Sequence, residues 1–459
     1  MWPVEQMKEE GIRCAPEENS FTYTFPPPYF TKSRGALRIP HTYANGSLTT
    51  SVSLYLHIPF CETDCTFCSL HRTAIHDADT ITRYLRALRR ELHALSKQNI
   101  RAQLDSVYIG GGTPTICSAV ELGELLDSVS GSFQLPDSPI EVSLECAPSP
   151  KRTFQQWKAY LNILASRKTL AVNRVSFGVQ SDDSATLRHM GRAGGELAAL
   201  ALLRAADETC ASYNADFLLN YPTVPSAIAQ PDWIRSLLSW VDGVRATGLR
   251  LPSLSIYQLW DVDSIAIGRA RQVQFLGEEQ LLDRKWSLQE GLFSRQYSPV
   301  IISTVAQSDE HASQCFKNRH LSFCHIGCGS GAYSIFPLEV VQRPRNILQY
   351  MLACERGDVL ESSSCCYRLT PEEVEIRRLI MGLRSYEWIP VTGSMGKLHV
   401  LTRSLQETQE RIEILVGLGL VDKNNNMYRL TNTAFLIANE LSTYLHPASH
   451  SRTGAIHGS

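Results

Sequence analysis

The strongest constraint on the fold is an alternation of short apolar runs with helical patterns that begins at residue 53. The runs that predict strands cover 53–60, 104–109, 140–145, 174–180, 215–220 and 253–259. Segments with apolar residues at helical spacing separate them, as over 79–95. Strands that alternate with helices pair in parallel through βαβ units. The pattern therefore predicts an α/β fold with six parallel strands.

The remainder of the chain divides into two flanking regions. We expect an N-terminal extension, a main α/β domain and a C-terminal α-rich domain, over residues 1–50, 51–340 and 341–459. In the last of these, predicted helices over 371–383 and 402–418 precede a short hairpin that turns at Asn424-Asn425-Asn426. This order is typical of a small winged-helix-like domain. No basic cluster accompanies it, so we expect a cap over the substrate site rather than a DNA-binding wing.

Three cysteines follow the first predicted strand at C-x3-C-x2-C spacing, as Cys61, Cys65 and Cys68. Cysteine thiolates are the usual ligands of iron–sulfur clusters, and three of them leave the fourth iron of a four-iron cluster open. A structural zinc site needs a fourth ligand, which His57 or His71 would have to supply at a spacing unlike that of familiar zinc fingers. We therefore interpret the motif as a cluster-binding loop.

Composition excludes several classes of partner. The formal net charge of -2 gives no electrostatic basis for binding nucleic acid or an anionic membrane. No apolar run reaches the roughly 18 residues that a membrane span needs. The N-terminal residues, which include Glu5, Glu9 and Glu10, do not resemble a secretory signal, so the 13 cysteines indicate reduced thiols. We expect a cytoplasmic protein whose substrate is a small molecule.

The segment Tyr55-x-His57-x-Pro59-Phe60 before the cysteines resembles the radical S-adenosylmethionine (SAM) superfamily. Within it, the chain resembles the branch typified by oxygen-independent coproporphyrinogen dehydrogenase. The resemblance implies a partial (β/α)6 barrel with the small C-terminal domain, and a [4Fe-4S] cluster on Cys61, Cys65 and Cys68. These cysteines would be catalytic as well as metal ligands, because the reduced cluster cleaves SAM to a 5′-deoxyadenosyl radical. An electron donor such as flavodoxin or ferredoxin is implied.

Further matches to the family lie at the predicted strand ends. Gly110-Gly111-Gly112-Thr113-Pro114 matches its glycine-rich segment, where the backbone approaches the methionine part of SAM. Glu145 occupies the first position of the family's Glu-x-Asn-Pro, although Ala147 replaces the asparagine. Gln180 ends a stretch close to Asn-Arg-x-Ser-x-Gly-x-Gln.

Two charged residues complete the implied site. Arg192 would pair with the SAM carboxylate, and Asp216 would contact ribose hydroxyls or a second ligand. The cofactor-binding residues implied by the resemblance are Tyr55, Phe67, Gly111, Gly112, Thr113, Glu145, Gln180, Arg192 and Asp216.

Departures on the substrate side suggest the subtype. Leu70 stands where the dehydrogenase has a further cysteine, residues 316–324 lack the His-Asn-x-x-Tyr haem motif of the related chaperone, and 262–265 replace the usual Pro-Gly-Thr. This combination resembles the class C radical SAM methylases and cyclopropanases, which implies two SAM molecules and methyl or methylene transfer to an sp2 carbon. The substrate would be a heteroaromatic or conjugated natural product.

Two alternatives remain open from the sequence. One is a porphyrin-directed enzyme, either a coproporphyrinogen dehydrogenase or a haem-degrading methyltransferase. The other is a haem chaperone without radical chemistry, against which the missing haem motif counts.

Overall fold

The computed structural model describes residues 2–12, 51–74, 77–98, 103–192, 194–220, 232–259, 276–321, 324–363, 365–391 and 403–446. The substitution noted at 262–265 and most of the N-terminal extension lie outside these ranges. Among the described helices, none is both long and apolar enough to cross a membrane.

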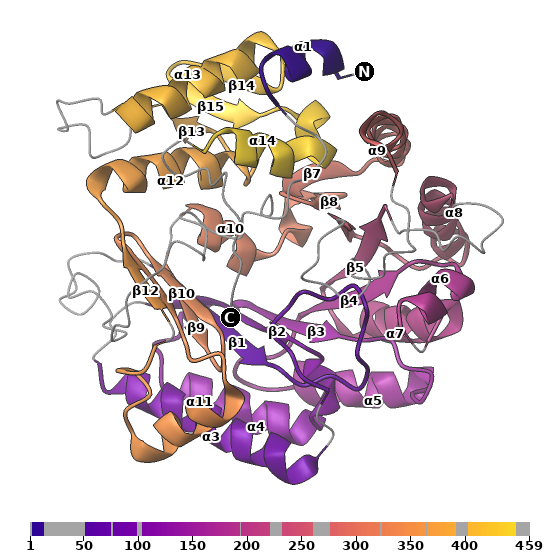
Figure 1. The fold of residues 1–459 in the computed structure, drawn as a ribbon. Coiled ribbons are helices and arrows are strands. Elements are labelled where there is room, and N and C mark those ends of the chain that lie inside the picture. Colours follow the sequence, from indigo (N-terminus) through magenta and orange to yellow (C-terminus); the bar gives the residue numbers. More distant parts are fainter. Residues whose placement is uncertain are drawn as a thin grey trace.

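Six parallel strands form the centre of the molecule, as predicted (Figure 1). Each pairs in parallel with the next, in the order β1 (Val52–Ile58), β2 (Leu104–Gly111), β3 (Glu141–Cys146), β4 (Arg174–Gln180), β5 (Ser212–Leu219) and β6 (Ser253–Gln258). Burial is nearly continuous along these strands, as expected for a sheet covered on both faces. The α/β prediction is confirmed.

The connecting helices cover the outer face of these strands (Figure 1). They are α3 (Ala78–Ser96), α4 (Ala119–Ser130), α5 (Phe154–Ala165), α6 (Ser184–His189), α7 (Glu196–Thr209), α8 (Trp233–Ala246) and α9 (Glu278–Phe293). Local capping boxes begin two of these helices. The side chain of Ser118 accepts a hydrogen bond from the backbone N–H of Glu121, and the Glu121 side chain accepts one from the N–H of Ser118. Thr153 and Gln156 form the same pair of bonds at the start of α5.

Short strands extend the sheet beyond both edges of the predicted six. β9 (His325–Cys328) pairs in parallel with β1 and is followed outward by β10 (Tyr333–Phe336), β11 (Glu339–Gln342) and β12 (Cys365–Arg368). At the other edge, β8 (Thr304–Ala306) and β7 (Ser298–Ile301) follow β6. Each spans only three or four residues, which is too short for a periodic signal in the sequence. In this twelve-strand order β7 and β12 are the ends, so the barrel stays open.

Most of the C-terminal region lies across the open side, opposite α3, α4 and α5, whereas its first helix packs on α3 (Figure 1). It contains α11 (Ile347–Arg356), α12 (Pro371–Leu383), α13 (Arg403–Gly417) and α14 (Ala438–Tyr444), with a three-stranded sheet of β13 (Ile389–Pro390), β15 (Met427–Leu430) and β14 (Val421–Asn424). The predicted helices and hairpin are present, and the turn residues Asn425 and Asn426 have positive φ.

Part of the extension packs on this region. Residues Val4–Glu9 form α1, and Trp2 Nε1, just before it, donates to Thr433 O at 2.5 Å. The buried Trp2 ring also meets Trp286 of the barrel helix α9 edge-on at 5.1 Å. The domain boundaries at residues 50 and 340 remain predictions.

A buried ion pair fastens α3 to the added strands. Glu91 of α3 is fully buried and accepts from Arg343 Nε at 2.5 Å. Its second oxygen accepts from Gly329 N at 2.9 Å and from the Tyr350 hydroxyl at 2.7 Å. Three donors from residues 329–350 thus converge on one carboxylate, which compensates the cost of burying its charge.

Replacing Glu91 with alanine should strongly destabilise the fold, because it leaves the Arg343 guanidinium buried without its carboxylate. We expect the free energy of unfolding to fall by about 3–5 kcal/mol, measured by urea denaturation of the cluster-free protein. The matched control is Glu124→Ala, which removes the exposed partner of Arg89 and should cost less than about 1 kcal/mol. Equal losses in the two variants would show that the buried pair has no special role.

Candidate functional site

A cavity of about 570 Å³ lies over the carboxyl ends of β1 to β6. All twelve residues singled out from the sequence line it, namely Tyr55, Cys61, Cys65, Phe67, Cys68, Gly111, Gly112, Thr113, Glu145, Gln180, Arg192 and Asp216. Segments more than 150 residues apart in the chain are therefore brought to one surface. The carboxyl end of a parallel barrel is the position at which such folds place their chemistry.

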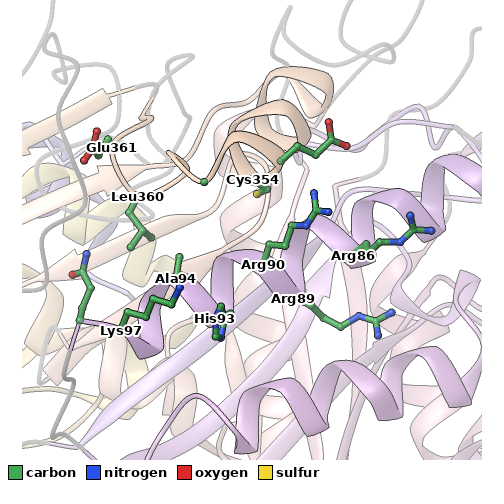
Figure 2. Close-up of a pocket in the computed structure, with 12 residues that line it drawn as sticks. Arg86, Arg89, Arg90, His93, Ala94, Lys97, Cys354, Leu360 and Glu361 are labelled. Carbon is green, nitrogen blue, oxygen red and sulfur yellow. The ribbon is translucent and has the colours of Figure 1, made fainter.

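A larger cavity, of about 1040 Å³, lies on the outside of the barrel between α3 and α11 (Figure 2). Basic side chains from α3 line it, among them Arg86, Arg90 and Lys97. It contains none of the residues predicted to bind the cluster or SAM, and it is far from the strand ends that carry them. We therefore place the functional site in the smaller cavity.

The loop after β1 is held in shape by its own backbone. Cys61 N donates to Thr73 O at 3.0 Å, and Thr73 N donates to Pro59 O at 2.7 Å, which brings the end of the loop back to its start. Arg72 crosses the loop, donating to Cys65 O at 2.7 Å and pairing with Asp64. These bonds fix the loop with all three thiols lining the cavity.

The three thiols fit a four-iron cluster better than a single ion. Among the described residues, no three His, Cys, Asp or Glu side chains are grouped to hold one metal ion. Ligands of a four-iron cluster bind three different irons, so their sulfurs lie farther apart than the ligands of one ion. Burial raises the pKa of the Cys61 thiol to about 11, with smaller contributions from Cys68 and Cys65. Cluster binding must therefore displace this proton.

Glycine is required where β2 passes the cluster loop. Gly112 N donates to Ile58 O at 2.8 Å, and a Cβ at Gly112 would lie 2.5 Å from Phe60 O and 2.9 Å from Cys61 Sγ. Its neighbour Gly111 has φ +117, a conformation that side chains rarely adopt. The backbone of β2 therefore approaches the first cysteine as closely as the chain allows.

Replacing Gly112 with alanine should displace Cys61 and reduce the iron retained after anaerobic reconstitution. We expect at least half of the wild-type iron and sulfide to be lost in chemical analysis of the protein. The control is Gly243→Ala in α8, where a Cβ would meet no atom within 4 Å. Full iron content in Gly112→Ala would contradict the steric argument.

A hydrogen-bonded network connects the cluster loop to β1 and to Ser330. His57 Nε2 donates to His71 O at 2.8 Å, and the Tyr55 hydroxyl donates to His57 Nδ1 at 3.0 Å. His71 Nε2 donates in turn to Ser330 Oγ at 3.0 Å, since that hydroxyl already donates to backbone carbonyls. From the sequence, His71 was considered only as a zinc ligand, and Ser330 only as part of the segment 326–334, which resembles the family's Gly-x-Gly-x-Gly-Ala-x-Ser. The contact between them was not predicted, because a bond over 259 residues leaves no local pattern.

Two carboxyl groups occupy the floor of the cavity. Glu145 accepts from Gly111 N and the Tyr108 hydroxyl, both at 3.0 Å, yet burial raises its pKa. Asp216 accepts from Asn214 Nδ2 at 2.7 Å. Burial, with the Glu145 charge as a smaller cause, raises the pKa of Asp216 from 3.8 to about 7. Buried carboxyl groups whose pKa is raised can donate as well as accept hydrogen bonds with a ligand when they are protonated.

The shifted carboxyl of Asp216 should make the cluster-free protein less stable as the pH rises. Its pKa is higher in the folded state, so the folded protein keeps a proton that the unfolded chain loses between pH 3.8 and about 7. Stability should fall across this window by up to about 1.4 kcal/mol per pH unit. Asp216→Asn should flatten the dependence of the free energy of unfolding on pH, measured by urea denaturation. Asp358→Asn, on the surface, is the control and should leave that dependence unchanged. An unchanged dependence in Asp216→Asn would refute the raised pKa of Asp216.

The two other polar residues from the sequence also face the cavity. Gln180 ends β4 with φ +67, and its side-chain Oε1 is buried without a hydrogen-bond partner. Arg192 Nη2 donates to Gly178 O at 2.9 Å, which anchors the guanidinium beside Gln180. Both positions leave polar groups available to a ligand.

Most of the charged side chains that line the cavity are basic. The basic residues are Arg72, Lys151, Arg152, Arg192, Arg319 and Arg384, whereas the acidic ones are Glu62, Glu145 and Asp216. Apolar residues, including Phe316, Ile301 and Ile302, lie between them. The sequence analysis did not single out Arg152 or Arg319, because neither belongs to a recognisable motif.

Comparison with known proteins supports the fold and the cofactors. Residues 55–224 match the family model described as "Radical SAM superfamily". The solved coproporphyrinogen III oxidase (HemN) of Escherichia coli, described as a radical SAM enzyme, superimposes with a TM-score of 0.74 at 19% identity, over 97% of this chain and 99% of its own. The prediction of a radical SAM fold is confirmed. The family's cofactors are a [4Fe-4S] cluster and SAM, in agreement with the cofactor prediction.

Two curated relatives are named for haem and for coproporphyrinogen III. "Heme chaperone HemW" of Haemophilus influenzae is 26% identical over 409 residues, which cover 85% of this chain and 96% of that protein. "Oxygen-independent coproporphyrinogen III oxidase" of Bradyrhizobium diazoefficiens is 34% identical over 145 residues, which cover 31% of this chain and 30% of that protein.

These names overturn the subtype prediction. The expectation of a class C methylase or cyclopropanase acting on a natural product was wrong, because the relatives are named for haem and coproporphyrinogen III. That expectation rested on what Leu70 and residues 316–324 lack. A missing side chain shows that a contact is absent, but it does not identify the reaction that replaces it.

Proposed function

We propose that this chain, whose residues 55–224 form a radical SAM domain, acts in the cytoplasm on a tetrapyrrole that carries carboxylate side chains. The observation that carries the proposal is the lining of the cavity, where six basic residues face three acidic ones beside the cluster cysteines. Carboxylates are the groups that arginine binds with two parallel hydrogen bonds. The names of the relatives supply the tetrapyrrole class.

The cofactor side of the cavity would be formed by the residues predicted from the sequence. Cys61, Cys65 and Cys68 would hold the cluster, and the backbone at Gly112, with Glu145, would bind the amino end of SAM. When bound, the cluster and SAM supply one-electron chemistry that abstracts hydrogen from a substrate. A flavodoxin-like or ferredoxin-like donor would provide the electron.

Three further residues would orient SAM and the substrate. Arg192 would pair with the SAM carboxylate, because its guanidinium is anchored to Gly178 O at one end only. Asp216 would bind ribose hydroxyls, since its raised pKa allows the carboxyl to donate as well as accept. Gln180 would bind a polar group of either ligand through its unpartnered oxygen.

The substrate side suits a flat, largely apolar ring system with charged edges. Phe316, Ile301 and Ile302 offer apolar contact for a macrocycle, and the basic residues lie around them. A cavity of about 570 Å³ is within the usual range for a small-molecule site. Closure by the C-terminal region, which contributes Arg384 just after α12, would exclude water from the cavity.

A second candidate function is haem binding without turnover. It is favoured by one observation, which is that the relative matched over 96% of its length is named a haem chaperone. The basic and apolar lining serves haem propionates as well as those of coproporphyrinogen.

The test is an anaerobic assay of the reconstituted protein with dithionite, SAM and either coproporphyrinogen III or haem. We expect 5′-deoxyadenosine, measured by mass spectrometry, to rise at least fivefold when the tetrapyrrole is present. Cys65→Ala should abolish this product through loss of the cluster, whereas Cys366→Ala, on β12, should leave it unchanged.

Three other results are informative. Haem binding with a shifted Soret band and no SAM cleavage would select the second candidate. Decarboxylated porphyrin would identify the reaction with coproporphyrinogen. Failure to bind either tetrapyrrole, in a protein with full iron content, would refute the proposal.

A further inference from the structure

We propose that Arg319 and His320, on helix α10 (Gln314–Leu321), form a subsite for a carboxylate group of the ligand bound in the cavity. Both residues line the cavity that contains the cluster cysteines. The inference rests on the proposed function in one respect only, which is that the ligand carries a carboxylate. It adds the protein groups that would recognise that carboxylate.

Arg319 is a half-buried cation with no acidic partner. No Asp or Glu among the described residues lies within ion-pair distance of it, whereas the nearby Lys317 pairs with Glu387 at 3.5 Å. Its buried Nε has no hydrogen-bond partner. The guanidinium lies 5.3 Å from the centre of the Phe316 ring, which packs on Tyr108 at 4.9 Å. The aromatic contacts thus hold the guanidinium at the cavity wall, and its N–H groups remain available to a ligand.

His320 supplies the second polar group. It is 1% exposed, and its Nδ1 donates to Phe316 O at 2.7 Å within the same helix. The opposite ring nitrogen, Nε2, is buried and has no partner, although the residue lines the cavity. Buried polar atoms in folded proteins are nearly always hydrogen-bonded, so this nitrogen marks a position that a ligand completes.

The surroundings of these two residues are positive. The charged and titratable groups that act on His320 are Arg384, Arg319 and His325, and all are basic. Burial, together with the two arginines, holds the pKa of His320 well below its usual value. Two carboxylates lie near α10, and both already have other partners. Glu141 accepts from Ser313 and from Gln314 N at the start of the helix. Asp105 accepts from Ser106 and interacts with Asn318.

A carboxylate supplies the negative charge that this corner lacks. It accepts from the Arg319 guanidinium in a bidentate geometry that suits a carboxylate. By reducing the positive potential, it also allows His320 to take up a proton from solvent and to donate from Nε2. The carboxylate has two possible sources, a propionate of the tetrapyrrole or the carboxylate of a second SAM molecule.

The first arm of the test compares coproporphyrin III with its tetramethyl ester, which keeps the macrocycle and removes the charges. Binding to the reconstituted protein is measured by fluorescence quenching. Arg319→Ala should weaken binding of the acid by about tenfold or more and leave the ester unchanged. Arg319→Lys should bind the acid more tightly than Arg319→Ala does. His320→Gln should weaken binding of the acid and leave binding of the ester unchanged. Arg356→Ala, on the surface of α11, is the matched control.

The second arm measures the number of SAM molecules bound per protein by equilibrium dialysis. If Arg319→Ala leaves binding of the coproporphyrin acid unchanged but lowers the number of SAM molecules bound by one, the subsite exists and holds the second SAM. If Arg319→Ala changes the binding of neither ligand, the subsite is refuted. Wild-type protein that binds neither acid nor ester would refute the tetrapyrrole proposal alone, and the SAM arm would still decide the subsite.

Discussion

The placement of three thiols at the end of β1 is the constraint on which the remainder of the structure depends. The loop that carries them has no regular secondary structure, so its shape must come from bonds to other segments. Thr73 and Arg72 supply such bonds inside the loop, and His71 connects it to Ser330. Gly329, the residue before Ser330, donates to the buried carboxylate of Glu91. A carboxylate with three donors is costly to rearrange, because each lost bond would leave a buried polar group unpaired.

Charge divides the cavity into two parts with different tasks. The floor, where Glu145 and Asp216 project from β3 and β5, is acidic but partly neutralised by burial. Another part of the lining, where Arg319 and Arg384 lie, is basic. A zwitterion such as SAM suits the floor, which offers carboxyl groups and backbone donors together, whereas a polyanionic ligand suits the wall. If SAM and a polyanionic ligand bind as proposed, this distribution of charge would direct them to different parts of the cavity.

The sequence predicted the central fold well, because its signals are local. The alternation of strands and helices and the turn at Asn425-Asn426 are each encoded within a few residues. The cavity wall around Arg319 and His320 could not be predicted, since α10 reaches the cavity only by packing on β1, β2 and α12, which lie far from it in the sequence. The subtype failed for a related reason: substitutions such as Leu70 were read without the side chains that surround them in space.

The two sides of the cavity also come from different parts of the chain. Every residue predicted to bind the cluster or SAM precedes residue 220, and the family match ends at 224, whereas Phe316, Arg319, His320 and Arg384 all follow residue 300. Arg319, His320 and Arg384 can therefore be replaced without changing a residue of the cysteine loop, whereas Phe316 contacts Tyr108, which donates to Glu145 on the cofactor side. The residues that select the ligand and the residues that hold the cofactors thus lie on separate segments, so the ligand can change in evolution while the cofactor chemistry is kept.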